Sequence, residues 1–164
     1  GIEVEEFPSQ IAQVALWLTY HQMNMLVSEE FGQYFRRLPL IHTAKIHCGN
    51  ALRMDWNDLI SVYDVDYILG NPPFVGKQHQ TAAQKADMEY IFSGVNSAGV
   101  LDYVTAWYMK AVRYVRGDAR TVELLDNLPG MPIPPRERVK IAFVSTNSIT
   151  QGEQVGVLCN ERIY

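Results

Sequence analysis

The sequence has little cysteine, no long apolar run and no excess of positive charge, and each absence excludes a class of protein. Its two cysteines, Cys48 and Cys159, form neither a disulfide framework nor a CxxC metal pair. No stretch approaches the roughly 18 apolar residues that a membrane-spanning helix needs. No N-terminal segment resembles a secretion signal, and the four histidines lack zinc-site spacing. We therefore expect no metal, no membrane and a reducing compartment such as the bacterial cytoplasm.

Length and charge indicate a single acidic domain. The chain has 164 residues, of which 48% are apolar, and this is enough for one packed core. Its 18 acidic and 14 basic residues give a formal charge of -4, whereas a nucleic-acid-binding domain that acts alone is usually basic. The first residue is Gly1, and a strand-like Ile2-Glu3-Val4 follows directly. We expect residues 1–164 to be one domain cut from a longer polypeptide.

Hydrophobic patterning predicts strands that alternate with helices. Alternating or β-branched residues predict four strands, at 2–5, 44–48, 64–69 and 139–145. Apolar residues at helical spacing predict four helices, at about 8–30, 82–92, 101–117 and 151–162. Thr81–Gln84 and Thr150–Glu153 resemble capping boxes, and the proline-rich stretch 117–137 predicts a loop or an insertion. The order predicts an α/β fold, with a mostly parallel sheet covered by helices on both faces.

Polar residues follow each predicted strand. Glu3 or Glu5 lies at the end of the first strand, and Asn50 follows the second. Asn71 follows the third strand, and Ser145-Thr146-Asn147 follows the last. Because ligands of open α/β sheets bind beyond the carboxyl ends of the strands, we expect these four ends to converge on one rim.

Asn71-Pro72-Pro73-Phe74 is the most informative segment. With proline at about 5% of residues, such a tetrapeptide arises by chance on the order of once per thousand chains of this length. A rigid turn is the simplest interpretation, since proline can continue neither a helix nor a ladder. Alternatively, the Asn71 side-chain oxygen and the Pro72 carbonyl could accept both N–H bonds of an exocyclic amine and favour its attack. Phe74 offers a flat face for a base flipped out of a duplex.

Five segments of the chain resemble segments of the amino-group DNA methyltransferases that use S-adenosylmethionine, and they occur in the same order along the chain as in that family. The NPPF segment and its flanks are specific, whereas the other four are individually weak. The segments look like those of adenine-specific enzymes of bacterial restriction-modification systems, and the resemblance implies a partial Rossmann-like methyltransferase fold. The matching segments are GIEVEEFPSQIAQVALW (1–17), IHCGNAL (46–52), DVDYILGNPPFVGKQ (64–78), LDYVTAWYMKAV (101–112) and FVSTNSITQGEQV (143–155).

The resemblance also implies roles for single residues. Asn71, Pro72, Pro73 and Phe74 match the catalytic motif, and asparagine in first place points to adenine N6. Glu3 matches the acidic residue that binds the cofactor ribose. Asn50 matches a position, usually Asp, that contacts the cofactor adenine, and here an amide replaces the charge. Ser145-Thr146-Asn147 matches the strand end that shapes the target-base pocket, although a helix entry loop is an equal alternative. Lys77 could contact phosphate or simply be solvated.

One element of the resemblance is missing. The glycine-rich loop of F-x-G-x-G type, which lets the backbone approach the methionine part of the cofactor, is not in this sequence. We therefore expect the fragment alone to bind S-adenosylmethionine poorly, and the full-length parent to bind double-stranded DNA. Two alternatives stay open: a methyltransferase acting on the guanine amino group of ribosomal RNA or on a protein glutamine, and a non-catalytic remnant.

Overall fold

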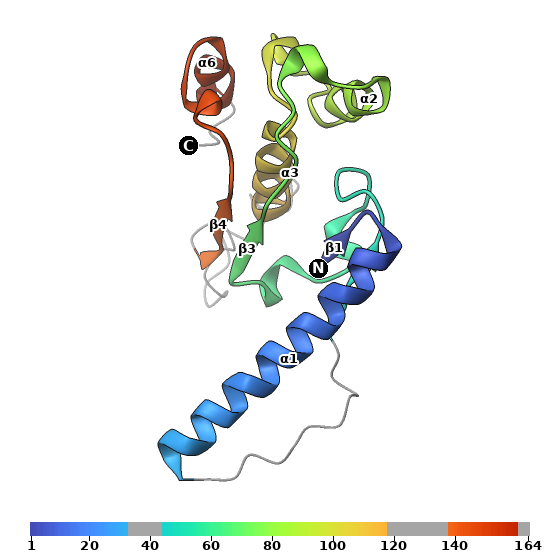
Figure 1. Cartoon of the computed structure of the whole chain (residues 1–164). Coiled ribbons are helices and arrows are strands. Elements are labelled where there is room, and N and C mark those ends of the chain that lie inside the picture. Colours follow the sequence, from blue (N-terminus) through green and yellow to red (C-terminus); the bar gives the residue numbers. More distant parts are fainter. Residues whose placement is uncertain (33–43, 118–137, 161–164) are drawn as a thin grey trace. The chain divides into compact units, whose positions relative to one another are not determined.

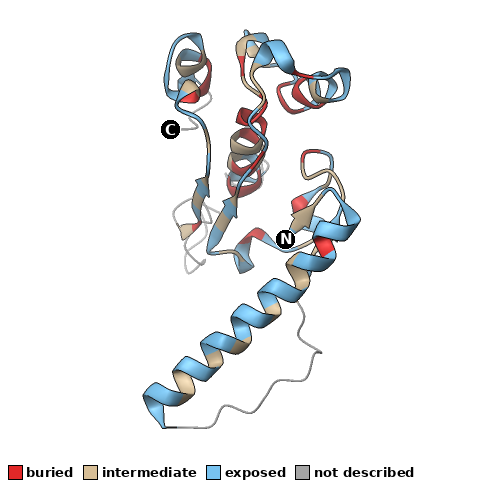
Figure 2. Ribbon diagram, in the orientation of Figure 1, coloured by how far each residue is buried: buried red, intermediate tan, exposed pale blue. Residues whose placement is uncertain are grey.

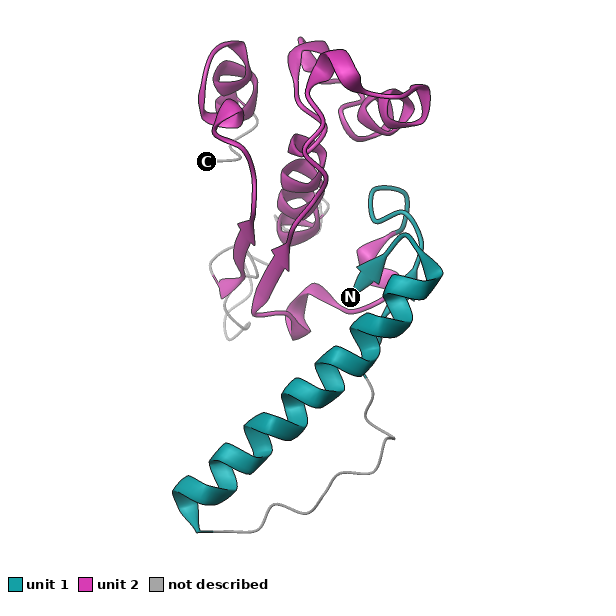
Figure 3. Cartoon of the chain, viewed as in Figure 1, with its two compact units in different colours: residues 1–54 teal, residues 55–164 magenta. Residues whose placement is uncertain are grey.

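The computed structural model describes residues 1–32, 44–117 and 138–160 (Figure 1). The chain divides into two compact units, residues 1–54 and residues 55–164 (Figure 3). Most of the predicted insertion at 117–137 lies outside the described residues, as does the predicted end of the last helix.

The first unit is built from one strand pair and a long helix. Strand β1 (Ile2–Glu3) runs parallel to β2 (His47–Cys48), with Glu3 opposite Cys48. Helix α1 (Glu6–Phe31) ends at Gly32, whose φ of 61° is the left-handed conformation that glycine adopts freely. The predicted strands and helix are confirmed, although both strands are shorter. The helix begins at Glu6, two residues before Pro8. It can include the proline, because the N–H groups of a first turn have no partner within the helix, so the missing proline N–H costs no hydrogen bond.

The apolar face of α1 is exposed. Figure 2 shows most of the helix in the colour of exposed residues, with shorter stretches of intermediate burial, and the one buried side chain is Ser9. We expected this face to pack into a core, and among the described residues it does not. A 26-residue helix is about 39 Å long, whereas the described residues of its own unit include only two strands, of two residues each. The exposed apolar residues include Phe7, Ile11, Val14, Leu18, Met23, Leu26 and Phe31.

The second unit contains the other strand pair. Strand β3 (Tyr67–Gly70) runs parallel to β4 (Lys140–Phe143), with Gly70 opposite Phe143. Both predicted strands are confirmed in shorter form, and both strand pairs among the described residues are parallel. The described residues form two separate two-stranded sheets, however, rather than the one predicted sheet. Strands of two to four residues offer few backbone groups through which further strands could pair.

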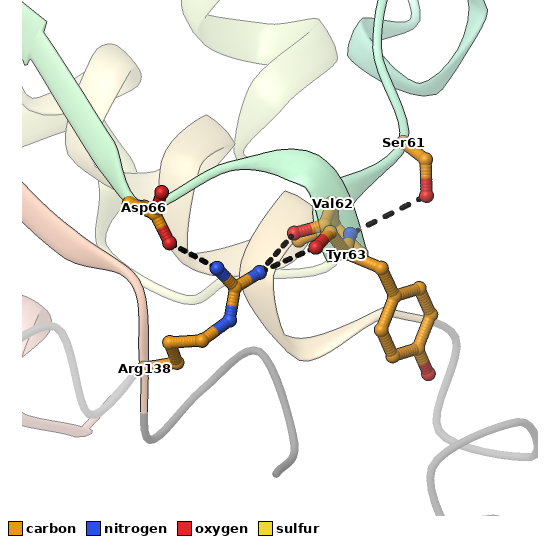
Figure 4. A network of polar contacts seen from close by, with 5 residues as sticks. All are labelled: Ser61, Val62, Tyr63, Asp66 and Arg138. Atoms are coloured by element: carbon orange, nitrogen blue, oxygen red, sulfur yellow. Dashed lines mark hydrogen bonds and ion pairs between the residues drawn. The ribbon is translucent and has the colours of Figure 1, made fainter. Parts of the chain in front are cut away.

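Arg138 fixes the start of β4 beside the approach to β3. Its guanidinium forms an ion pair with the Asp66 carboxylate and donates to the backbone oxygens of Tyr63 (2.6 Å) and Val62 (3.4 Å) (Figure 4). The Lys140 backbone N–H also donates to the backbone carbonyl oxygen of Asp66, at 2.9 Å. These contacts secure the β3–β4 register at the end of the pair opposite the predicted site.

Helices α2 (Ala82–Ile91) and α3 (Thr105–Arg116), together with the segment between them, form most of the described core of the second unit. The capping box predicted at α2 is confirmed: Thr81 Oγ1 accepts from the Gln84 N–H, and Gln84 Oε1 accepts from the Thr81 N–H. Figure 2 shows the buried side of α3. The buried residues on and between these helices include Asp87, Met88, Ile91, Phe92, Leu101, Tyr103, Val104, Thr105, Ala106, Met109, Ala111, Tyr114 and Val115.

Helix α6 (Glu153–Asn160) begins later than predicted. Thr150 ends the 3₁₀ turn Asn147–Thr150, and its hydroxyl donates to the backbone and side-chain oxygens of Asn147, both at 2.8 Å. The capping box predicted at Thr150–Glu153 is therefore wrong, because the threonine completes the preceding turn instead of opening the helix.

Candidate active site

The segments that follow β3 and β4 lie at one edge of the second unit. Asn71 follows β3 directly, and Ser145 lies two residues beyond the end of β4. The ladder continues past both strands, since the Val144 N–H donates to the Gly70 oxygen at 3.0 Å. The structure therefore brings together two of the predicted site segments, residues 71–74 and 145–147.

The NPPF segment combines a packed backbone with exposed functional groups. Pro72 is buried, whereas Asn71 and Pro73 are exposed and the Phe74 side chain is 47% exposed. Gly70 directly precedes the motif and leaves room for the Phe143 ring. A Cβ atom at this position would lie only 3.0 Å from two carbons of that ring. The motif thus begins on backbone packed closely against β4, and its amide and its aromatic ring remain accessible.

Tyr108 of α3 supports the end of β4. Its ring meets the Phe143 ring edge to face, at a centroid distance of 5.1 Å. Its hydroxyl is hydrogen bonded to the Phe143 carbonyl oxygen (3.1 Å) and to Ser145 Oγ (3.2 Å). The sequence analysis predicted the helix that contains Tyr108 but missed the role of its hydroxyl. The available signal was a phenol within an apolar stripe, because such a group usually has a hydrogen-bond partner.

Asp102 lies at the centre of the polar contacts around this edge, and sequence reasoning also missed it. Its carboxylate accepts from the Lys77 N–H (3.2 Å), Ser148 Oγ (2.7 Å) and Gln154 Nε2 (3.0 Å). Its own N–H donates to Gln154 Oε1 at 3.0 Å. Burial alone would raise the pKa of Asp102, but the three donated hydrogen bonds outweigh it and lower the pKa below its ordinary value.

Two further hydrogen bonds tie the loop after the motif to the segment just before α3. The Tyr103 N–H donates to the Val75 oxygen at 2.9 Å, and Gln80 Nε2 donates to the Leu101 oxygen at 3.1 Å. Lys77 itself opens the 3₁₀ turn Lys77–His79 and is exposed. A phosphate contact by its side chain stays a prediction.

The three polar residues after β4 are engaged differently. Ser145 is half-buried against Tyr108. Thr146 and Asn147 are exposed and bond within their own turn: Thr146 Oγ1 lies 2.7 Å from Ser148 Oγ, and Asn147 Oδ1 accepts from Thr150. Their part in a target-base pocket stays a prediction, and hydrogen bonds within the turn hold both residues in place.

The two predicted cofactor residues lie together within the first unit. Glu3 is the last residue of β1, and Asn50 lies two residues after the end of β2. The Gly49 N–H donates to the backbone carbonyl oxygen of Glu3 at 2.8 Å. Glu3 Oε1 accepts from the next two backbone N–H groups, at 2.8 and 3.2 Å. Asn50 Oδ1 accepts from the Leu52 N–H at 2.9 Å. Convergence of all four strand ends on one rim stays a prediction.

The described part of the chain contains no cluster of three or more His, Cys, Asp or Glu residues that could hold a metal ion. Within the same residues, no helix is both long and apolar enough to cross a membrane. Cys48 and Cys159 are exposed free thiols.

Comparison with known proteins decides the family. Residues 1–163 match the MmeI DNA-methyltransferase domain. The chain belongs to this family. This MmeI-type domain is 37% identical to DNA methyltransferase A of Bacillus subtilis (strain 168), and the match covers 98% of this chain and 16% of that protein. The predicted membership of the DNA methyltransferases of restriction-modification type is confirmed.

A solved structure agrees with this assignment. The chain is 52% identical, with a TM-score of 0.77, to a chain in the structure of the type IIL restriction-modification enzyme MmeI in complex with DNA. The match covers 98% of this chain and 19% of that one. The domain thus spans less than a fifth of the length of either relative.

Proposed function

We propose that this MmeI-type domain is the catalytic part of a DNA adenine-N6 methyltransferase that uses S-adenosylmethionine within a restriction-modification system. The observation that carries the proposal is the placement of Asn71–Phe74 at the carboxyl end of β3, beside the end of β4, with Asn71 and Phe74 accessible. Family membership favours DNA over RNA or protein as the substrate. MmeI, the structural relative, is in complex with DNA, and this supports DNA binding by the parent of this chain.

The chemistry follows from two carbonyl oxygens. The lone pair of an adenine amino group is delocalised into the ring, so the amine is a weak nucleophile. The Asn71 side-chain oxygen and the Pro72 carbonyl accept its two N–H bonds and favour the tetrahedral nitrogen that forms when the N–C bond is made. As this bond forms, the methyl carbon would part from the donor sulfur, which keeps the electron pair of the broken C–S bond. The charged nitrogen then releases one proton to water and becomes the secondary amine. The rigid proline backbone limits reorganisation during this step.

Phe74 and Lys77 complete the proposed substrate contacts. A duplex base must leave the stack before its amino group can reach these carbonyls. The half-exposed Phe74 ring can stack on the flipped base, and the exposed Lys77 can contact a phosphate beside it. Ser145, Thr146 and Asn147 form the other side of the target-base pocket in this proposal.

Glu3 and Asn50 fit S-adenosylmethionine, which supplies the methyl group when it is bound. The Glu3 carboxylate can accept from the ribose hydroxyls, because a carboxylate has several accepting positions and the local turn occupies one of its oxygens. The Asn50 amide can bond to the adenine ring. Parallel pairing in both units and the TM-score of 0.77 support a Rossmann-like methyltransferase fold for the domain. The bacterial cytoplasm stays our expected location.

The test is methyl transfer by the full-length parent. Labelled S-adenosylmethionine is incubated with the enzyme and, in parallel, with duplex DNA, ribosomal RNA or total protein, and the labelled product is identified by nucleoside or peptide analysis. We expect N6-methyladenine in DNA. Label at cytosine N4, in RNA or in protein would contradict the proposal, and so would the absence of label in every substrate.

A further inference from the structure

The Asp102 carboxylate, half-buried just before α3, connects segments that are far apart in the sequence. One oxygen accepts from the Lys77 N–H, 25 residues earlier. The other accepts from Ser148 Oγ and Gln154 Nε2, 46 and 52 residues later. These three donors lie in the loop after β3, in the turn after β4 and in α6. One side chain therefore holds both segments that leave the β3–β4 edge.

Both connected segments carry residues of the proposed site. Lys77 is three residues beyond Phe74, and Ser148 comes directly after Asn147. A shift at either donor would be transmitted to the NPPF backbone or to the 145–147 segment. We propose that Asp102 is a positioning residue, which sets the two sides of the target-base pocket in one arrangement without touching the reacting atoms. This inference rests on the function proposed above.

Only a carboxylate satisfies this set of donors. Gln154 is fixed in orientation, because its Oε1 accepts from the Asp102 N–H while its Nε2 donates to the carboxylate. In Asp102→Asn, the amide has one accepting oxygen and one donating nitrogen. If its oxygen faces the Lys77 N–H, its nitrogen meets Gln154 Nε2, and the reverse orientation places donor against donor at Lys77. The variant keeps the volume of the side chain and breaks the connection.

The first readout does not depend on catalysis. In the full-length parent, we expect Asp102→Asn to speed amide hydrogen exchange about 10-fold in peptides covering both 74–80 and 144–150, as expected for the loss of about one charge-assisted hydrogen bond. Asp58→Asn, the same chemical change at an exposed aspartate of this unit, is the matched control and should leave both peptides unchanged.

The second readout is the kinetics of methyl transfer. We expect Asp102→Asn to lower kcat about 10- to 100-fold, because a small misplacement of positioned groups costs rate. KM for the cofactor should change less than twofold. In the double variant Asp102→Asn/Gln154→Glu, the new carboxylate accepts from both the amide at 102 and the backbone N–H of that residue. The donor–acceptor pattern between residues 102 and 154 is restored, whereas the Ser148 hydroxyl must turn to accept and the 3.4 Å donation from Gln154 Nε2 to the Ser148 backbone oxygen is lost. Part of the lost kcat and exchange protection should therefore return.

The outcomes separate the two proposals. If the wild-type parent does not methylate DNA, the proposed function fails, while the exchange data still judge the role of Asp102. Unchanged exchange in Asp102→Asn, unchanged kcat, or a double variant no better than the single one would overturn the inference. If Asp102→Asn fails to fold, Ser148→Ala decides: it removes one donor, and we expect a fall in kcat of about fivefold. An unchanged kcat in that variant would overturn the inference as well.

Discussion

Backbone hydrogen bonds join distant residues at the carboxyl ends of both strand pairs, such as Gly49 to Glu3 and Val144 to Gly70, but the polar side chains there bond over very different ranges. At the β1–β2 edge, Glu3 and Asn50 bond to backbone N–H groups one or two residues away. At the β3–β4 edge, Asp102 and Tyr108 bond to groups 25 to 52 residues away. The difference matches the proposed tasks. Local turns suffice to present a few polar atoms to a cofactor, whereas a pocket made from two separate segments needs long-range contacts to hold its shape.

The largest effect is expected at the motif itself. Asn71→Ala in the full-length parent should lower the rate of methyl transfer about 100-fold or more, because it removes one of the two preorganised acceptors. Initial rates with labelled cofactor and saturating DNA measure this. Asn57→Ala, at an exposed asparagine of the same unit, is the control and should stay within twofold of wild type. A rate near wild type for Asn71→Ala would remove the motif from the mechanism.

At the β1–β2 edge, the expected effect is smaller and lies in binding. Glu3→Gln should weaken S-adenosylmethionine binding about 10-fold, the size expected when a charged hydrogen-bond acceptor becomes neutral. Isothermal titration of the parent with cofactor gives Kd directly. Glu5→Gln, at the exposed neighbouring glutamate, should leave Kd unchanged. Equal effects of the two substitutions would show that the contact is not specific to Glu3.

Tyr108→Phe tests a single hydroxyl at the β3–β4 edge. It keeps the ring against Phe143 and removes the hydrogen bonds to the Phe143 oxygen and Ser145 Oγ. The local cost should be about 1 kcal/mol, which corresponds to roughly fivefold faster amide exchange in a peptide covering 143–147. Tyr67→Phe, where the ring is 70% exposed, serves as the comparison. The same exchange in both variants would mean that the hydroxyl does not hold this strand end.

The smallest expected effect is that of pH on the Asp102 contacts. Because its pKa is lowered below the ordinary 3.8, the carboxylate contributes stability above that pH, and the contribution is lost only as pH falls through the lower folded value. The ratio of exchange rates between Asp102→Asn and wild type, corrected for intrinsic exchange, should therefore stay constant from about pH 5 to about pH 8. A ratio that falls towards one over that range would show that the carboxylate is protonated there.

Much of the fold could be predicted from patterns that act over short distances. The four strands, the helices and the capping box at Thr81 follow from alternation, helical spacing and local hydrogen bonding. Strand lengths could not, because they depend on partners elsewhere in the chain. The capping box at Thr150 failed because Asn147, three residues earlier, competes for the same hydroxyl.

The candidate site was predictable in part for the same reason. Asn71–Phe74 is recognisable because its chemistry is contained in four consecutive residues. Asp102 and Tyr108 act on segments distant in sequence, and an acidic residue before a helix or a tyrosine within an apolar stripe is common in proteins of every function. Only the folded chain shows which donors meet the Asp102 carboxylate.

The most direct test of the account is single-turnover methyl transfer at rising cofactor concentration, with Asn71→Ala and Glu3→Gln of the full-length parent compared with wild type. We expect saturating S-adenosylmethionine to restore Glu3→Gln to within about threefold of the wild-type rate, because its defect is in binding. Asn71→Ala should stay about 100-fold slow at every concentration, because its defect is in the chemical step. Rescue of Asn71→Ala by cofactor would contradict the account.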